Sequence, residues 1–172
     1  MATPTLRERA QDEAARFLFT CWDEDQFPVD PFLIADSLEI DVFLANLPDD
    51  VAGIFRKKPN EKPEIYIAQG DIERRQRFTC AHELGHYAHL KLEGKLEHNS
   101  DETFIERRDP ASSLGTNPAE VFANEFAANL LMPAVAIRTL HARGMDAYDL
   151  SRFFDVSPTS MDYRLKNLGL PR

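Results

Sequence analysis

Residues 82–86 read His-Glu-Leu-Gly-His, and this pentapeptide restricts the fold because its two histidines can act together only on a helix. On an α-helix, residues i and i+4 lie on one face, one turn apart. His82 and His86 can therefore offer ring nitrogens to one metal ion about 2 Å from each. Glu83 is rotated by about 100° from His82, so it is placed to take a proton from a metal-held water and not to act as an in-line third ligand. The pattern is typical of the zinc-binding helix of metalloproteases.

The residues around the pentapeptide predict that its helix is buried. We expect the helix to run from a cap at Asp71 to about Leu90. Apolar side chains cover most of its circumference, namely Ile72, Phe78, Cys80, Ala81, Leu84, Tyr87 and Ala88. Cys80 points away from His82 and is predicted to serve packing. Buried histidines and a buried glutamate need polar partners, and a metal ion supplies them.

A catalytic zinc site usually has three protein ligands, so a third ligand has to come from elsewhere in the chain. Glu120 and Asn124 lie one turn apart on a helix predicted over residues 118–131, where Glu120 can bind the metal and Asn124 can support a ligand. The segment Asn117-Pro-Ala-Glu120 is equally typical of a helix start, in which Glu120 completes a capping box. Spacing alone leaves these two roles of Glu120 open.

Other acidic and imidazole side chains are weaker candidates for the third ligand. Glu125 points about 140° away from Glu120 on the same helix and is predicted to be a solvated charge. The remaining histidines, His89, His98 and His141, are predicted to be surface or hydrogen-bonded residues. Of these, His89 lies on a helix face next to that of His86 and could approach the site.

Length and composition restrict the class of protein. The 172 residues suit one domain with a small appendage, and a net charge of −9 does not predispose the chain to bind nucleic acid or anionic membranes. Two cysteines do not make a disulfide framework. No apolar run is long enough to span a membrane and the N-terminus lacks a signal-peptide core, so we expect a cytoplasmic location.

Hydrophobic periodicity predicts an α+β fold, and the His-Glu-x-x-His motif makes a zincin-like arrangement the expectation. We expect a small mixed or antiparallel sheet of about three strands packed on the motif helix, with further helices around it. Strands are predicted near residues 39–44, 53–56 and 64–67, and helices over 5–20, 31–38, 118–131 and 133–143. Asp30 is predicted to cap the second of these helices. Residues 91–117 form a long connection with a strand signal around 103–106. This connection can line a substrate cleft or be a plain surface loop.

The last part of the chain, residues 146–172, has helix-turn-helix spacing around Phe154-Asp-Val-Ser-Pro. Ser157 is predicted to cap the second helix and Gly169 to end it. We therefore divide the chain into a metallopeptidase domain over 1–145 and a tail over 146–172 that packs on the same core. Four acidic and four basic side chains leave the tail neutral, whereas a DNA reader is expected to carry a basic surface.

Two longer segments resemble the ImmA/IrrE family of zinc metallo-endopeptidases. They are Arg77-Phe-Thr-Cys-Ala-His-Glu-Leu-Gly-His-Tyr87 and Glu120-Val-Phe-Ala-Asn-Glu-Phe-Ala-Ala-Asn-Leu-Leu-Met-Pro133. The similarity extends to Pro28-Val-Asp-Pro31, the strand at Gly53 and the C-terminal helices. It implies that His82, His86 and Glu120 bind Zn²⁺, as in gluzincins, and that Glu83 is the catalytic base.

The same resemblance implies a regulatory role. Members of the family are typically encoded by bacteria or phages and cleave a partner repressor of the helix-turn-helix (XRE-like) type, in stress responses or the control of mobile elements. We therefore expect a zinc endopeptidase that acts on such a repressor. The alternative is a DNA-binding or protein-binding regulator that retains a zincin fold. The residue that stabilises the oxyanion is left open among His89, Tyr87, Tyr163 and Arg164.

Overall fold

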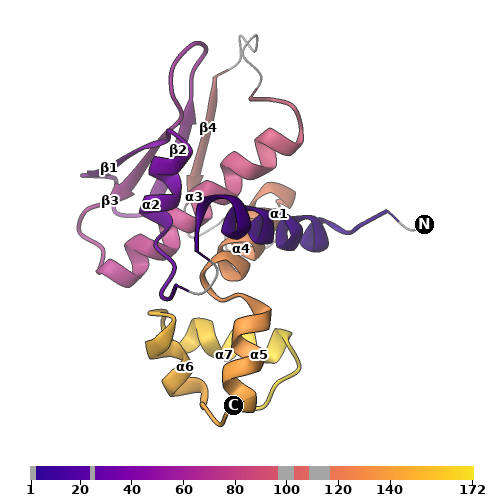
Figure 1. Cartoon of the computed structure of the whole chain (residues 1–172). Coiled ribbons are helices and arrows are strands. Elements are labelled where there is room, and N and C mark those ends of the chain that lie inside the picture. The colour runs from indigo at the N-terminus through magenta and orange to yellow at the C-terminus, as the bar shows by residue number, and fades with distance from the viewer. Residues whose placement is uncertain (1–2, 24–25, 97–102, 109–116) are drawn as a thin grey trace.

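The computed structural model describes residues 3–23, 26–96, 103–108 and 117–172, with the side chains of 106–108 left aside. Its elements combine helices with a small sheet, which confirms the α+β class (Figure 1). In chain order they are α1 (Leu6–Cys21), α2 (Pro31–Ser37), β1 (Asp41–Ala45), β2 (Gly53–Lys57), β3 (Glu64–Ala68), α3 (Glu73–Leu92), β4 (Phe104–Arg108), α4 (Pro118–Leu131), α5 (Ala134–Ala142), α6 (Ala147–Phe153) and α7 (Pro158–Asn167).

The strands form one mixed sheet in the order β1-β3-β2-β4. β1 is parallel to β3, while β2 is antiparallel to both β3 and β4. The fourth strand comes from the segment with the strand signal around residues 103–106. Phe55, Ile65 and Ile67 are fully buried on the face that α3 covers, which is the face that anchors the motif helix.

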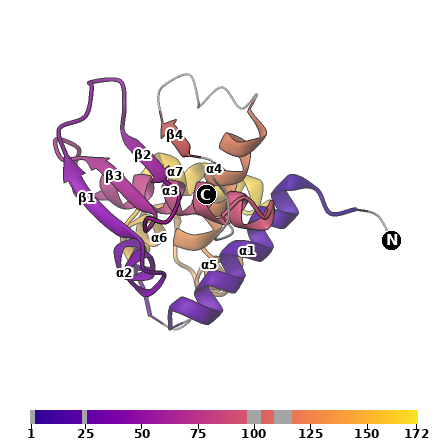
Figure 2. The same ribbon diagram turned by 90° about the horizontal axis from the view of Figure 1, so that it is seen from above.

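α3 is buried because other elements cover it from two sides. Seen from above in Figure 2, the sheet lies on one side of α3, and α4 and α1 lie on the other. Phe17 of α1 packs edge-on against Phe126 of α4, with ring centroids 5.1 Å apart, and also approaches Tyr87 of α3. The middle of α3 is enclosed in this way, so its polar side chains, among them His82, Glu83 and His86, must be satisfied within the protein.

The predicted cap at Asp71 is wrong. α3 begins at Glu73, its N-cap residue is Ile72, and no side chain caps it. Asp71 lies one position too early for capping. Its carboxylate instead pairs with Arg75 one turn later, at 3.1 Å. By contrast, Asp30 and Ser157 cap α2 and α7 as expected.

The helices α5, α6 and α7 group together at the end of the molecule away from the sheet (Figure 1). α6 and α7 are joined by a short turn in which Asp155 has a φ of +50°. Arg77 of α3 donates to the backbone carbonyl and carboxylate of Asp155 and, at 2.6 Å, to the carbonyl of Val29. The turn between α6 and α7 is thus hydrogen-bonded to the helix that carries the pentapeptide.

A second buried arginine connects this group of helices to α4. Arg164 of α7 donates to the carbonyl of Met132 at 3.0 Å and to the side-chain oxygen of Asn129 at 2.7 Å. A fixed guanidinium fork is well suited to satisfying several acceptors at a buried junction.

The division of the chain into a domain over residues 1–145 and a tail over 146–172 remains a prediction. None of the helices in the described part of the chain has the length and apolarity needed to cross a bilayer.

Candidate metal centre

The site lies where α3 and α4 approach most closely. A Cβ atom on Gly85 of α3 would lie 2.7 Å from the Cα and 3.0 Å from the carbonyl oxygen of Ala123 on α4, closer than real side chains come. Glycine therefore allows the two backbones to touch at this point. Glu120 lies one turn before Ala123, and the contact places it beside His86 of α3.

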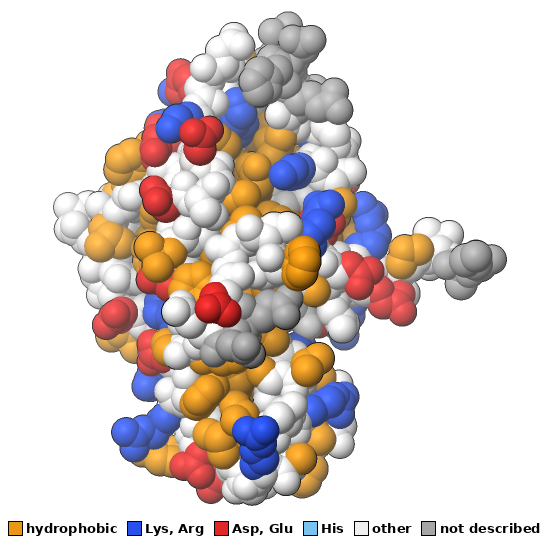
Figure 3. Space-filling model, viewed as in Figure 1, with side chains coloured by type: hydrophobic (Ala, Val, Ile, Leu, Met, Phe, Trp, Pro, Cys, Tyr) orange, Lys and Arg blue, Asp and Glu red, His pale blue; other side chains and the backbone are white. Residues whose placement is uncertain are grey.

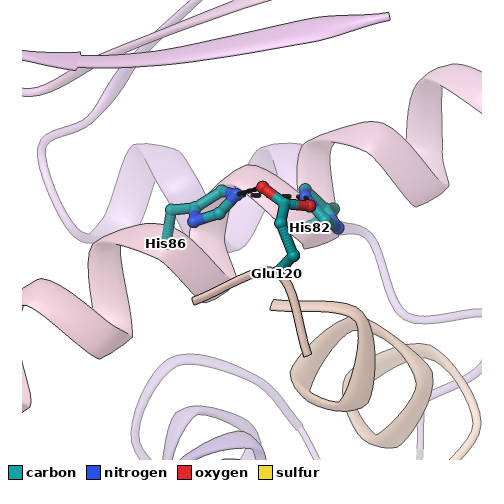
Figure 4. A group of neighbouring side chains, drawn as sticks. All are labelled: His82, His86 and Glu120. Carbon is teal, nitrogen blue, oxygen red and sulfur yellow. Dashed lines mark hydrogen bonds and ion pairs between the residues drawn. The ribbon is translucent and has the colours of Figure 1, made fainter. Parts of the chain in front are cut away.

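Three side chains converge at this contact, as Figure 4 shows. His82 and His86 project from α3 and the carboxylate of Glu120 enters between them from α4. The Nε2 atoms of the two histidines are 3.1 Å apart. His82 Nε2 lies 3.3 Å from Glu120 Oε2, and His86 Nε2 lies 3.1 Å from Glu120 Oε1. Each of the three residues is at most 3% exposed.

These separations fit a tetrahedral metal ion. Bonds of about 2.0–2.1 Å at tetrahedral angles hold ligand atoms about 3.3–3.4 Å apart. The two nitrogens are 3.1 Å apart, and each is 3.1–3.3 Å from the carboxylate oxygen that faces it. Two imidazole nitrogens and one carboxylate form a donor set that zinc accepts readily. Among the described residues, this is the group of histidine and acidic side chains whose ligand atoms lie within 4.8 Å of one another.

The carboxylate of Glu120 is held in its ionised form. Burial alone raises its pKa, but hydrogen bonds from His82 and His86 outweigh this effect and lower the pKa to about 2. An ionised carboxylate between two imidazoles is the protonation state that a divalent cation requires.

Asn124 orients one of the histidines. Asn124 lies one turn after Glu120 on α4, and its Oδ1 atom is 3.0 Å from Nδ1 of His82. The amide oxygen can only accept, so the His82 ring carries a proton on Nδ1 and presents Nε2 to Glu120 and His86. This arrangement is the one that metal-binding histidines use to fix their tautomer.

Glu83 is fully buried and follows His82 on α3, where its carboxylate lies against the first residue of β2, Gly53. Glu120 does not take the capping role at the N-terminus of α4. Asn117 caps the helix by accepting from the amide of Ala119 at 2.9 Å, while the Glu120 carboxylate points at the histidines.

The other candidates lie outside this group. The Glu125 carboxylate accepts from Asn129 at 3.1 Å, so it has a structural partner. The His89 ring packs against Phe122, with centroids 4.9 Å apart, and its pKa is lowered by burial. His141 is hydrogen-bonded to the carbonyl of Pro171, and His98 lies outside the described residues.

The residues considered for the oxyanion divide in a similar way. Tyr163 is 66% exposed on α7, and Arg164 is engaged at the junction with α4. The ring of Tyr87 packs between Phe17 and Phe55. Cys80 is fully buried, and burial raises the pKa of its thiol, as expected for a packing residue. Sequence reasoning did not single out Gly85, although a glycine inside a buried helix is itself a signal of close helix packing.

The sequence model of the IrrE N-terminal-like domain, Peptidase M78, matches residues 35–166, a range that contains all the site residues. The chain belongs to this family. The match confirms the resemblance to ImmA/IrrE proteins and supports a metallopeptidase type of function for the IrrE-like chain. No curated protein gives a significant match.

A solved structure is also similar to this IrrE-like chain. It is described as a Mycobacterium tuberculosis transcriptional regulator and superposes with a TM-score of 0.61 at 20% sequence identity. The alignment covers 98% of this chain and 54% of that one, so this chain spans about half the length of the solved protein. At this identity the similarity establishes the fold.

Proposed function

We propose that this chain is a zinc-dependent endopeptidase in which His82, His86 and Glu120 hold the metal. The observation that carries the proposal is the buried group of two Nε2 atoms 3.1 Å apart, each of which lies 3.1–3.3 Å from an oxygen of the Glu120 carboxylate. A bound Zn²⁺ would polarise the scissile carbonyl and lower the pKa of a bound water to about 7. Asn124 keeps the Nε2 atom of His82 directed at the centre.

Glu83 moves the proton in this proposal. Its carboxylate accepts a proton from the attacking water as the water oxygen bonds to the carbonyl carbon. The same carboxylate then donates that proton to the amide nitrogen as the C–N bond breaks. The complete burial of Glu83 keeps competing water away from this carboxylate.

The substrate we propose is a helix-turn-helix repressor of the XRE type, in a stress response or in the control of a mobile element. The resemblance to the ImmA/IrrE family supports this choice. Where such a repressor is encoded beside this chain, it is the first protein to test. We propose the cytoplasm as the compartment in which the two proteins meet.

The function is tested with the zinc-loaded protein and a proteome-derived peptide library, with new peptide termini read by mass spectrometry. Glu83→Gln should bind one zinc like the wild type but produce no new termini, because the amide cannot accept the proton. Glu61→Gln, an exposed loop substitution, is the matched control and should cleave normally. A purified wild-type chain with no affinity for zinc, or a Glu83→Gln protein that cleaves at the wild-type rate, contradicts the proposal.

A DNA-binding regulator with a retained zincin fold is the second candidate. The turn between α6 and α7 and the name of the solved relative favour it. Against it, Met161, Arg164 and Leu165 of α7 are buried, and on the face seen in Figure 3 basic and acidic side chains are interspersed. A gel shift at low salt with random-sequence duplex DNA separates the two candidates, since a DNA reader binds there most strongly.

A further inference from the structure

Gly53, the first residue of β2, lies directly against two side chains of α3. A Cβ atom built on it would lie 2.6 Å from Oε1 and 3.2 Å from Cδ of Glu83, and 2.5 Å from Cγ2 of Thr79. Ordinary contacts of a Cβ atom begin near 3.4 Å. The φ angle of Gly53 is not in the left-handed region, so the position needs a glycine for space and not for backbone conformation.

The backbone of Gly53 cannot easily retreat from this contact. It pairs with Ile67 of β3 on one side and with Arg108 of β4 on the other, inside the ladder of the sheet. Any added atom must therefore displace α3 side chains, which are fully buried at both Thr79 and Glu83. The backbone of β2 at Gly53 therefore keeps a fixed position relative to α3.

The two neighbours differ in how they can respond. Thr79 is β-branched on a helix, so its χ1 angle is restricted and its methyl group has little freedom. Glu83 has three side-chain torsions, and its contacting atom is the far end of the chain. Of the two neighbours, the Glu83 carboxylate is therefore the one that torsions can move, by about 0.8 Å if an ordinary 3.4 Å contact is to be restored, whereas the contact with Thr79 remains as a packing cost of any side chain at position 53.

We infer that Gly53 is a positioning residue for Glu83: the bare backbone of β2 sets where the catalytic carboxylate lies relative to the metal centre. The inference rests on the proposed function, because it assigns the geometry that the proposed base requires. A general base must lie within about 2.6–3.2 Å of the proton that it removes, so a shift of this size matters. Misplacement of a catalytic group by about 1 Å can cost a factor on the order of 100 in rate.

The test uses acetohydroxamate on the zinc-loaded full chain, so it does not depend on knowing the substrate. This probe chelates zinc and hydrogen-bonds to a carboxylate beside the metal. Gly53→Ala should weaken acetohydroxamate binding about tenfold or more while zinc affinity, measured by chelator competition, stays within about twofold. Gly70→Ala is the matched control, because a Cβ atom there meets nothing within 4 Å, and it should change neither quantity.

A second background shows whether Gly53 acts through Glu83. In Glu83→Ala the carboxylate is gone, so adding Gly53→Ala should change hydroxamate affinity by less than about twofold. In Gly53→Ala/Thr79→Ser the Cγ2 contact is removed and the hydroxyl is kept. Thermal stability should rise from that of Gly53→Ala, whereas hydroxamate affinity should remain low.

Each outcome decides between positioning and packing. Wild-type hydroxamate affinity in Gly53→Ala refutes the inference, as does an undiminished effect in the Glu83→Ala background or a recovery of hydroxamate affinity with Thr79→Ser. A wild-type chain that takes up no zinc refutes the proposed function itself, which is a separate result. On a cleavable peptide, Gly53→Ala should lower kcat and leave KM unchanged, the pattern of a group needed in the transition state.

Discussion

Substituting Gly85 by alanine should damage the metal centre more than it damages the fold. The new Cβ atom would lie 2.7 Å from Ala123 Cα and 3.0 Å from its carbonyl oxygen. Restoring ordinary contacts of 3.4 Å or more to both atoms requires α3 and α4 to separate by at least about 0.7 Å. Glu120 is one turn away on α4, so its carboxylate moves with the helix. Metal sites tolerate deviations of only about 0.2 Å in ligand distance.

We expect two opposing effects on stability. Alanine is favoured over glycine in a helix interior by about 1 kcal/mol, whereas overpacking a core costs about 1–3 kcal/mol. Gly85→Ala should therefore lower the free energy of unfolding of the metal-free protein by at most about 2 kcal/mol, measured by urea denaturation. Zinc affinity should fall about 10- to 100-fold, the range seen when the supports of metal ligands are removed. Chelator competition near neutral pH measures this affinity.

Two further variants make the Gly85 test specific. Gly70→Ala has free space around the new Cβ atom and should leave both stability and zinc affinity unchanged. Adding Ala123→Gly to Gly85→Ala removes only the 3.2 Å contact with the Ala123 Cβ, so most of the loss should persist. If Gly85→Ala binds zinc with wild-type affinity, helix proximity does not set the position of Glu120 and the reasoning is refuted.

Three further perturbations address the supports of the site. Asn124→Ala should weaken zinc binding about 10- to 100-fold with an intact fold, because His82 loses the acceptor of its Nδ1 proton. Isothermal titration with zinc measures the affinity, and an unchanged value would show that Asn124 does not orient His82. Lowering the pH from about 7.5 to about 5 should release the metal, because histidines bind a metal ion only in their neutral form. Glu120, with a pKa of about 2, stays ionised over this range. Metal retained after dialysis at the lower pH would contradict the prediction. Arg77→Lys should lower the free energy of unfolding by about 2–3 kcal/mol, because an ammonium group cannot replace the guanidinium that reaches both Val29 and Asp155. Urea denaturation measures this, and an unchanged midpoint would show that these hydrogen bonds add little to stability.

Local patterns in the sequence were sufficient for much of the fold. The helix that carries His82 and His86 follows from apolar periodicity, and the caps at Asp30 and Ser157 follow from residue chemistry. Asp71 failed as a cap because a carboxylate one position before the true N-cap finds Arg75 within reach instead. Local signals therefore identify elements better than they identify the residue at which an element begins.

The order of strands in the sheet could not be read from local patterns. β1 pairs with β3 and not with its neighbour in sequence, and β2 takes the place between β3 and β4. Which strands pair depends on long-range packing that short alternating segments do not encode. The buried junction roles of Arg77 and Arg164 were not predicted for a related reason, since a lone arginine in a sequence resembles a solvated charge until its acceptors are known.

The site shows the same division. His82, Glu83 and His86 are recognisable because one helix determines their relative positions. Glu120 could equally have been a capping residue, and only the distance between α3 and α4 decides which way its carboxylate points. That distance depends on Gly85 and Ala123, which carry no functional group.

The burial of the three proposed ligands also bears on how fast an ion could exchange. The side chains of His82, His86 and Glu120 are at most 4% exposed. The ligand atoms themselves can part from the ion only when the surrounding structure opens, so full release of the ion would be limited by that opening even where a small molecule reaches the ion's open position. The lifetime of the loaded state would then be a kinetic property of the packing around α3 and α4, separate from the equilibrium strength of the metal–ligand bonds.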